Sequence, residues 1–164
     1  MTQITPLKEI VSFPSNDPKD IPKPDAKKIV IFLVDDNELY LKSLEIQFRE
    51  IDAPVIKTFL TGEACLMNMS LKPDIIILDY FLNTVNKNAM DGLKTLVKIK
   101  DASPSTQVIM SSANENAEIA VNCLKFGAFD YIVKNENTFV KLKQIIKKIF
   151  SLYSKEKEII VWDW

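Results

Sequence analysis

Histidine is absent from the 164 residues of the chain, and its absence excludes several kinds of active site. Zinc sites built on imidazole, serine–histidine catalysis and a phosphohistidine intermediate on this chain all require that side chain. Cysteine is scarce too: Cys65 and Cys123 lack CxxC-type spacing, and each lies among apolar neighbours in a helical pattern. We therefore expect two buried free thiols rather than a metal centre.

Long apolar runs and an excess of one charge are also missing. No stretch approaches the roughly 20 apolar residues that span a bilayer, and no basic start with an apolar stretch marks a signal peptide. The 21 basic and 22 acidic side chains give a net charge of -1, which disfavours direct binding of nucleic acid. We expect a cytoplasmic protein with neither a membrane nor a nucleic acid as its direct partner.

The residues that are present indicate one folded domain with two extensions. Apolar residues make up 47% of the chain, enough for a core. Residues 1–26 hold five of the eight prolines and read as an irregular N-terminal extension. The pattern predicts a domain over residues 27–153 and a C-terminal tail over residues 154–164.

Within that domain, short apolar runs alternate with amphipathic stretches. The runs predict strands buried on both faces, and the stretches between them predict helices. We expect strands at 29–34, 55–60, 75–79, 108–112 and 131–133. We expect a first helix after Asn37, with an apolar face formed by Leu41, Leu44, Phe48 and Ile51, and further helices at about 63–69, 92–100, 117–126 and 138–153. This alternation predicts an α/β fold with a doubly wound, five-stranded parallel sheet.

Chemistry-bearing residues follow four of the predicted strands. Asp35 and Asp36 follow the first strand, and Asp79 ends the third. Ser111 and Ser112 end the fourth strand, and Lys134 follows the fifth. Because the functional crevice of such sheets lies at the carboxyl ends of the strands, we expect these side chains to meet there.

The meeting of these groups predicts phosphoryl transfer. Clustered carboxylates need a counter-ion, and Mg²⁺ prefers ligands that are oxygens. A carboxylate beside that ion can attack a phosphoryl group, while a lysine and a hydroxyl balance the charge on the transferred oxygens. Taken singly, each residue also fits a helix cap, a turn or a solvated charge, so the hypothesis depends on their combination.

Five stretches together make the chain resemble the receiver domains of two-component response regulators, including those like the chemotaxis regulator. They are 33–37 (LVDDN), 76–80 (IILDY), 90–93 (MDGL), 110–113 (MSSA) and 130–134 (DYIVK). The resemblance covers about residues 27–153. It implies a flavodoxin-like sheet of strand order 2-1-3-4-5, and a switch that receives its phosphoryl group from a histidine kinase or a histidine phosphotransfer protein.

The resemblance also implies roles for individual residues. Asp79 would be the phosphoacceptor, and Lys134 would contact the phosphoryl group. Ser112, which matches the family better than Ser111, and Tyr131 would form the switch. The Mg²⁺ ligands would be Asp35, Asp36, Asp79 and the backbone carbonyl of Phe81. The chain would act as a phosphorylation-dependent switch rather than as an enzyme with its own substrate.

Two features depart from the family pattern. Asn135 follows Lys134, where the family usually has a proline that is often in a cis peptide. The loop between Asp79 and Gly92 is polar and several residues longer than usual, so we expect it to be mobile beside the site.

Three other interpretations compete with this one. A phosphohydrolase similar to the haloacid dehalogenase group usually has an aspartate two residues after its nucleophile, where this chain has Phe81. A flavodoxin-like cofactor binder needs a phosphate-binding loop after the first strand, where Asp35 and Asp36 would repel phosphate. A degenerate receiver that is regulated without phosphate is the third.

The last six residues combine much apolar surface with both tryptophans of the chain, Trp162 and Trp164. Such a surface is costly to leave in water. It would fold back onto the domain, continue into a longer chain or support a homodimer.

Overall fold

The computed structural model describes residues 29–49, 55–84 and 87–161, with side chains described as far as Leu152. The predicted N-terminal extension, residues 1–26, and both tryptophans therefore lie outside the described residues. Among the described residues, no helix combines the length and apolar character that crossing a membrane requires.

A parallel sheet of five strands forms the centre of the domain, in the order β2-β1-β3-β4-β5. Its strands are β1 (Val30–Val34), β2 (Val55–Phe59), β3 (Ile75–Asp79), β4 (Gln107–Ser112) and β5 (Asp130–Val133). All four neighbouring pairs are parallel. The predicted fold class and the strand order implied by the resemblance are both confirmed.

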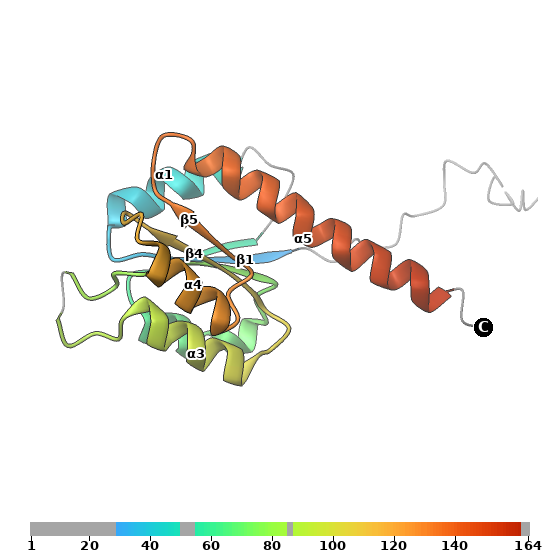
Figure 1. Cartoon of the computed structure of the whole chain (residues 1–164), viewed down its shortest axis with the longest axis horizontal. Helices are drawn as coiled ribbons and strands as arrows, with labels where there is room; N and C mark the ends of the chain where they lie inside the picture. Colours follow the sequence, from blue (N-terminus) through green and yellow to red (C-terminus); the bar gives the residue numbers. More distant parts are fainter. Residues whose placement is uncertain (1–28, 50–54, 85–86, 162–164) are drawn as a thin grey trace, which may run out of the picture.

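Helices cover both faces of the sheet (Figure 1). They are α1 (Glu38–Arg49), α2 (Gly62–Met67), the short 3₁₀ helix η1 (Met69–Leu71), α3 (Gly92–Ala102), α4 (Ala117–Lys125) and α5 (Thr138–Val161). One apolar layer joins α1 and α5 to the sheet, and the other joins α2, α3 and α4 to the opposite face.

The alternation of strand side chains builds both layers at once. In β3, Ile75 and Ile77 belong to the layer under α1 and α5, whereas Ile76 and Leu78 belong to the other layer. All residues of β3 are buried. Because full burial of one such side chain is worth about 1.5–3 kcal/mol, this strand anchors the fold and fixes the position of Asp79 at its end.

The two cysteines lie in the layer under α2, α3 and α4, and both are buried and free. Burial raises the pKa of the Cys65 thiol to about 12 and that of Cys123 to about 11. Both thiols therefore stay protonated at neutral pH, and their predicted place in the core is confirmed.

Helix α5 is longer than its pattern predicted, because it continues past Tyr153 to Val161. Lysine and glutamate at 155–158 are good helix formers, and neither glycine nor proline follows Gly127 to end the helix. Most of the predicted C-terminal tail is thus helical in its backbone.

The position of Asp79 also depends on the start of α3, where Gly92 N donates to Tyr80 O at 2.9 Å.

We predict that Gly92→Ala will destabilise the domain by about 1–3 kcal/mol and displace Asp79. A Cβ at Gly92 would overlap the carbonyl oxygen of Asp79 and lie 2.7 Å from Cα of Tyr80. Thermal unfolding and the amide resonances of Asp79 and Tyr80 check this expectation. Parent-like Asp79 resonances in a folded Gly92→Ala protein would contradict it.

Gly127→Ala is the matched control, because Gly127 has a φ of 94° and its Cβ would meet only the flexible side chain of Lys100, at 3.2 Å. We expect a cost of about 1–2 kcal/mol from the left-handed backbone, with the Asp79 resonances unchanged.

Candidate functional site

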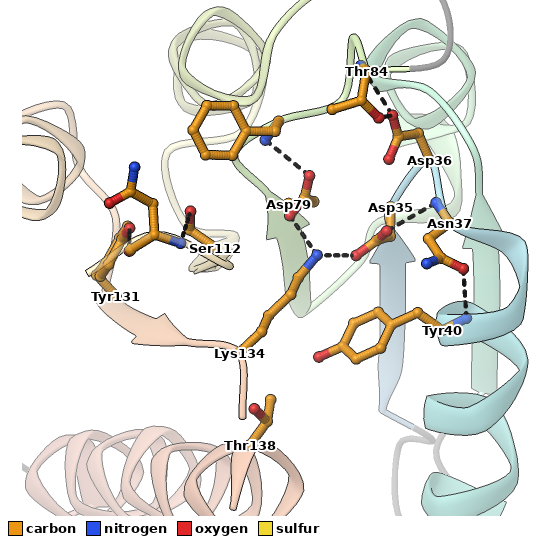
Figure 2. Close-up of polar contacts among 12 residues, drawn as sticks. Asp35, Asp36, Asn37, Tyr40, Asp79, Thr84, Ser112, Tyr131, Lys134 and Thr138 are labelled. Atoms are coloured by element: carbon orange, nitrogen blue, oxygen red, sulfur yellow. Dashed lines mark hydrogen bonds and ion pairs between the residues drawn. The ribbon is translucent and has the colours of Figure 1, made fainter. Parts of the chain in front are cut away.

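The predicted residues meet at the carboxyl ends of β1, β3 and β5. Asp35 follows β1, Asp79 ends β3 and Lys134 follows β5, and Figure 2 shows their side chains converging. Lys134 lies 99 positions from Asp35 in the sequence and is hydrogen-bonded to it. The parallel sheet is the cause, because it places the ends of strands that are distant in sequence along one edge.

Lys134 is the only ammonium that the described residues place between these carboxylates. Its Nζ lies 2.6 Å from Asp35 Oδ2 and 2.5 Å from Asp79 Oδ1. Its side chain is 19% exposed, whereas those of Asp35 and Asp79 are 5% and 4% exposed. Burial alone would lower the pKa of Lys134, but the charges and hydrogen bonds of the two aspartates outweigh burial and raise it. The amine is therefore a permanent cation.

Asp79 is held through both of its carboxylate oxygens. Oδ1 pairs with Lys134, and Oδ2 accepts a hydrogen bond from Phe81 N at 2.8 Å. Burial nonetheless raises the pKa of Asp79, with a further contribution from the charge of Asp35, while Lys134 and the Phe81 N–H act in the opposite direction. The ionised carboxylate is thus kept in an environment that only partly compensates its charge.

Asp35 and Asp36 differ in their surroundings although they are adjacent. Asp35 is 4% exposed and accepts from Asn37 N at 2.9 Å in addition to its pair with Lys134. Asp36 is only half-buried and is bonded by Thr84 from the loop after β3. Asp35 is therefore held by Lys134 and Asn37, whereas Asp36 is more exposed and is held by Thr84.

A divalent cation suits this arrangement. One carboxylate oxygen from each of Asp35, Asp36 and Asp79 lies within 4.8 Å of the others. Hard oxygen donors that carry net negative charge are the ligands that Mg²⁺ prefers, and waters or phosphate oxygens complete its octahedron. The donor set fits the predicted ion.

Thr84 contacts the site although no motif in the sequence indicated it. Its backbone N donates to Asp36 Oδ2 at 3.1 Å, and its hydroxyl donates to the same oxygen. The end of the same loop is also bound, because Met90 N donates to Glu63 Oε1 at 2.7 Å. The long loop after β3 was predicted as a mobile polar segment, and the structure ties it to two carboxylates.

The two serines at the end of β4 point to different surroundings. Ser112 Oγ accepts from Asn114 N at 3.1 Å, and Tyr131 Oη donates to Asn114 O at 2.7 Å, so both predicted switch residues hold the same short segment. Ser111 Oγ has no hydrogen-bond partner among the described residues and lies near Tyr40. Alternation along the strand thus separates the two candidate hydroxyls.

The turn after Lys134 is formed without proline and without a cis peptide bond. Asn135 N donates to Thr138 Oγ1 at 2.7 Å, and the Thr138 hydroxyl donates to Asn135 O at 2.7 Å. Thr138 is the first residue of α5 and is 4% exposed. These bonds set the direction of the chain after Lys134, at the position where the family usually has a proline.

Comparison with known proteins points in one direction. The family model described as the response regulator receiver domain matches residues 31–147. The chain is 31% identical over 121 residues to a protein-glutamate methylesterase/protein-glutamine glutaminase of Archaeoglobus fulgidus, a match that covers 73% of this chain and 33% of that protein. It is 33% identical over 89 residues to the regulatory protein AtoC of Escherichia coli, covering 54% of this chain and 18% of AtoC.

Solved structures agree with the sequence comparisons. The CheX–CheY–BeF3–Mg complex from Borrelia burgdorferi contains a chain of 28% identity and TM-score 0.66, with 74% of this chain and 89% of that chain covered. The response regulator domain of Thermotoga maritima CheB has 25% identity and TM-score 0.62, covering 76% and 96%. The chain thus matches whole receiver domains but spans only about a third or less of the curated relatives named above.

We predict that Asp79→Asn will stabilise the metal-free domain at pH 7. Because burial raises the pKa of Asp79, ionisation is less favourable in the folded than in the unfolded chain. The stability that protonated Asp79 contributes is present below the unfolded pKa of about 3.9, and it is lost as the pH rises through the folded pKa. The advantage of Asp79→Asn should therefore grow above about pH 4 and vanish below it.

Thermal unfolding in a chelator across this pH range measures the difference. Asp101→Asn, which changes an exposed carboxylate on α3, is the matched control and should leave stability at pH 7 within about 0.5 kcal/mol of the parent. Lower stability of Asp79→Asn at pH 7 would show that the pairing with Lys134 outweighs desolvation.

Proposed function

The chain belongs to the response regulator receiver domain family of two-component signalling, and on that premise we propose that Asp79 is its phosphoacceptor. The observation that carries this proposal is the position of the Asp79 carboxylate, 2.5 Å from the Lys134 ammonium and within 4.8 Å of oxygens of Asp35 and Asp36. A nucleophile, a cation for the transferred oxygens and a set of metal ligands thus share one edge of the sheet.

In the proposed reaction, a carboxylate oxygen of Asp79 attacks the phosphorus of a phosphohistidine on a histidine kinase or a histidine phosphotransfer protein. The P–N bond of the donor breaks as the new P–O bond forms, and the histidine ring leaves with the bond's electron pair. Asp79 becomes an acyl phosphate, and water later cleaves it to restore the carboxylate. The same carboxylate can take the group from a small acyl phosphate, in which a P–O bond breaks instead.

The surrounding residues have separate tasks in this step. Lys134 already contacts Asp79 and is placed to pair with oxygens of the incoming group, while the Ser112 hydroxyl donates to another. Asp35, Asp36, Asp79 and the backbone carbonyl of Phe81 would hold Mg²⁺, which supplies positive charge to the transferred oxygens. Phe81 N already donates to Asp79 and so keeps that backbone segment beside the carboxylate.

The output of the switch follows from the contacts of Ser112 and Tyr131. Both hold the Asn114 segment in the unphosphorylated site. If Ser112 turns to the phosphoryl group, Asn114 N loses its acceptor, and Tyr131 can leave Asn114 O and turn inward. Phosphorylation then biases the segment between β4 and α4 through differential contacts in two states.

The partner, the assembly state and the cellular location of the protein remain proposals. The net charge of -1 supports a protein partner rather than nucleic acid. The methylesterase activity of some relatives is not proposed for these residues, because the chain matches only about a third of their length. A homodimer through the C-terminal residues, and residence in the cytoplasm, stay predictions.

We predict that acetyl phosphate with Mg²⁺ will label Asp79 alone, as mapped by mass spectrometry of the acyl phosphate. Asp79→Asn should abolish labelling, whereas Asp101→Asn should label like the parent. Label at another residue of Asp79→Asn, at the parent level, would refute the assignment.

We further predict that Mg²⁺ stabilisation depends on Asp36 more than on Asp35, because Asp35 is already bound to Lys134 and Asn37 N. An ion at 100 times its Kd should stabilise the parent by about 2.7 kcal/mol. This gain, measured by thermal unfolding with and without Mg²⁺, should disappear in Asp36→Ala. A full gain in that variant would place the metal elsewhere.

The switch is tested by the ring resonances of Tyr131 before and after phosphorylation. We predict that they shift in the parent and stay unchanged when Asp79→Asn is treated with the same donor. Ser112→Ala should weaken the shift, because Asn114 N then lacks its acceptor in both states. An unchanged Tyr131 ring in the fully phosphorylated parent would contradict this mechanism.

A further inference from the structure

Lys134 has a third neighbour that its two carboxylate partners do not explain. Its Nζ lies 4.7 Å from the centroid of the Tyr40 ring, and Figure 2 shows Tyr40 reaching from α1 toward it. An ammonium at this distance is attracted by the negative face of an aromatic ring. The ring therefore belongs to the immediate surroundings of the cation that the site depends on.

The start of α1 determines where this ring lies. Asn37 precedes the helix, and its Oδ1 accepts from Tyr40 N at 3.1 Å. The residues before Asn37 are the two aspartates of the site, and Asn37 N donates to Asp35 Oδ1 at 2.9 Å. One short segment thus positions both Asp35 and the ring beside Lys134.

A second, independent observation concerns the hydroxyl of Tyr40. Tyr40 Oη is buried and has no hydrogen-bond partner among the described residues, and the same is true of Ser111 Oγ. The two hydroxyls are near enough to interact with each other, and Ser111 acts on the pKa of Tyr40, which burial raises. Apolar side chains would fill this space without burying either hydroxyl, so packing alone does not account for the pair.

We propose that Tyr40 is a positioning residue for Lys134, whose ring keeps the ammonium in place while the charge on Asp79 changes. This inference rests on the proposed function of Asp79. Of the three neighbours of Nζ, the Asp79 carboxylate becomes an acyl phosphate whose negative charge lies on its phosphoryl oxygens, and Asp35 would be shared with the metal. The ring is neutral, and its attraction does not depend on the ionisation or phosphorylation of Asp79.

Ser111 lies near the hydroxyl of the Tyr40 ring. It is the β4 partner of Asp79 in the sheet register, so its hydroxyl lies level with the phosphoacceptor. In this arrangement Ser112 forms the switch with Tyr131, whereas Ser111 lies with Tyr40 beside the Lys134 ammonium.

The test compares Tyr40→Leu with Tyr40→Phe in the full chain, using acetyl phosphate and Mg²⁺. Loss of a cation–π contact should lower the rate constant for labelling of Asp79 by roughly three- to thirtyfold in Tyr40→Leu. Tyr40→Phe keeps the ring and should stay within about twofold of the parent. Equal losses in the two variants, or no loss in Tyr40→Leu, would overturn the proposal.

Two controls separate positioning from general damage to the fold. Lys148 Nζ lies 5.6 Å from the Phe129 ring, away from the site, so Phe129→Leu removes a similar contact and should leave the labelling rate unchanged. In a Lys134→Met background, Tyr40→Leu should cause no further loss, because the residue it positions is gone. Losses that simply add in the double variant would overturn the proposal.

A spectroscopic measurement keeps this inference separate from the assignment of Asp79. The Lys134 ε-methylene protons should show an upfield ring-current shift in the unphosphorylated parent and in Tyr40→Phe, and lose it in folded Tyr40→Leu. A parent without this shift lacks the contact, and the inference fails. A parent that shows the shift but is not labelled at Asp79 would overturn the proposed function, and with it the role of Tyr40 in phosphoryl transfer.

Discussion

The site depends on one interaction, the pairing of the Lys134 ammonium with Asp35 and Asp79 at 2.6 and 2.5 Å. Three carboxylates within 4.8 Å of one another repel strongly in a poorly hydrated setting. Lys134 supplies one positive charge from within the protein, which leaves an excess of negative charge. That excess makes a divalent cation a natural further partner. Burial is the main cause that raises the pKa of Asp79 despite the adjacent lysine, and the charge of Asp35 adds to it.

The scaffold keeps these charges together because their strands are held by apolar layers on both sides. Every residue of β3 is buried, so Asp79 has little freedom to move away from its neighbours. Lys134 is fixed from two directions, since its N donates to Ser112 O at 2.7 Å and the Thr138 bonds shape the turn that follows. Favourable burial of the sheet thus offsets the cost of gathering like charges at its edge.

Around this centre, the polar contacts divide into a side that resists change and a side that permits it. Tyr40 lies on α1, and Ser111 lies in β4, whose residues after Gln107 are all buried, so rearrangement there would expose apolar surface. Ser112, Asn114 and Tyr131 are joined by single hydrogen bonds where the chain leaves β4 and enters the exposed residues 113–116. A charge added at Asp79 therefore meets less resistance toward α4 than toward α1, which gives the switch its direction.

Local sequence determined the elements, the sheet and the identity of the acids and the lysine, because burial on two faces imposes apolar runs and strand ends place polar residues at one edge. The order of the strands and the roles within the site followed from family resemblance. Only the tertiary structure decided that Ser111 faces Tyr40 while Ser112 joins Tyr131, that Thr84 reaches Asp36 across 48 positions, and that α5 continues to Val161. No local pattern encodes such contacts, because they depend on which side chains the packed layers bring face to face.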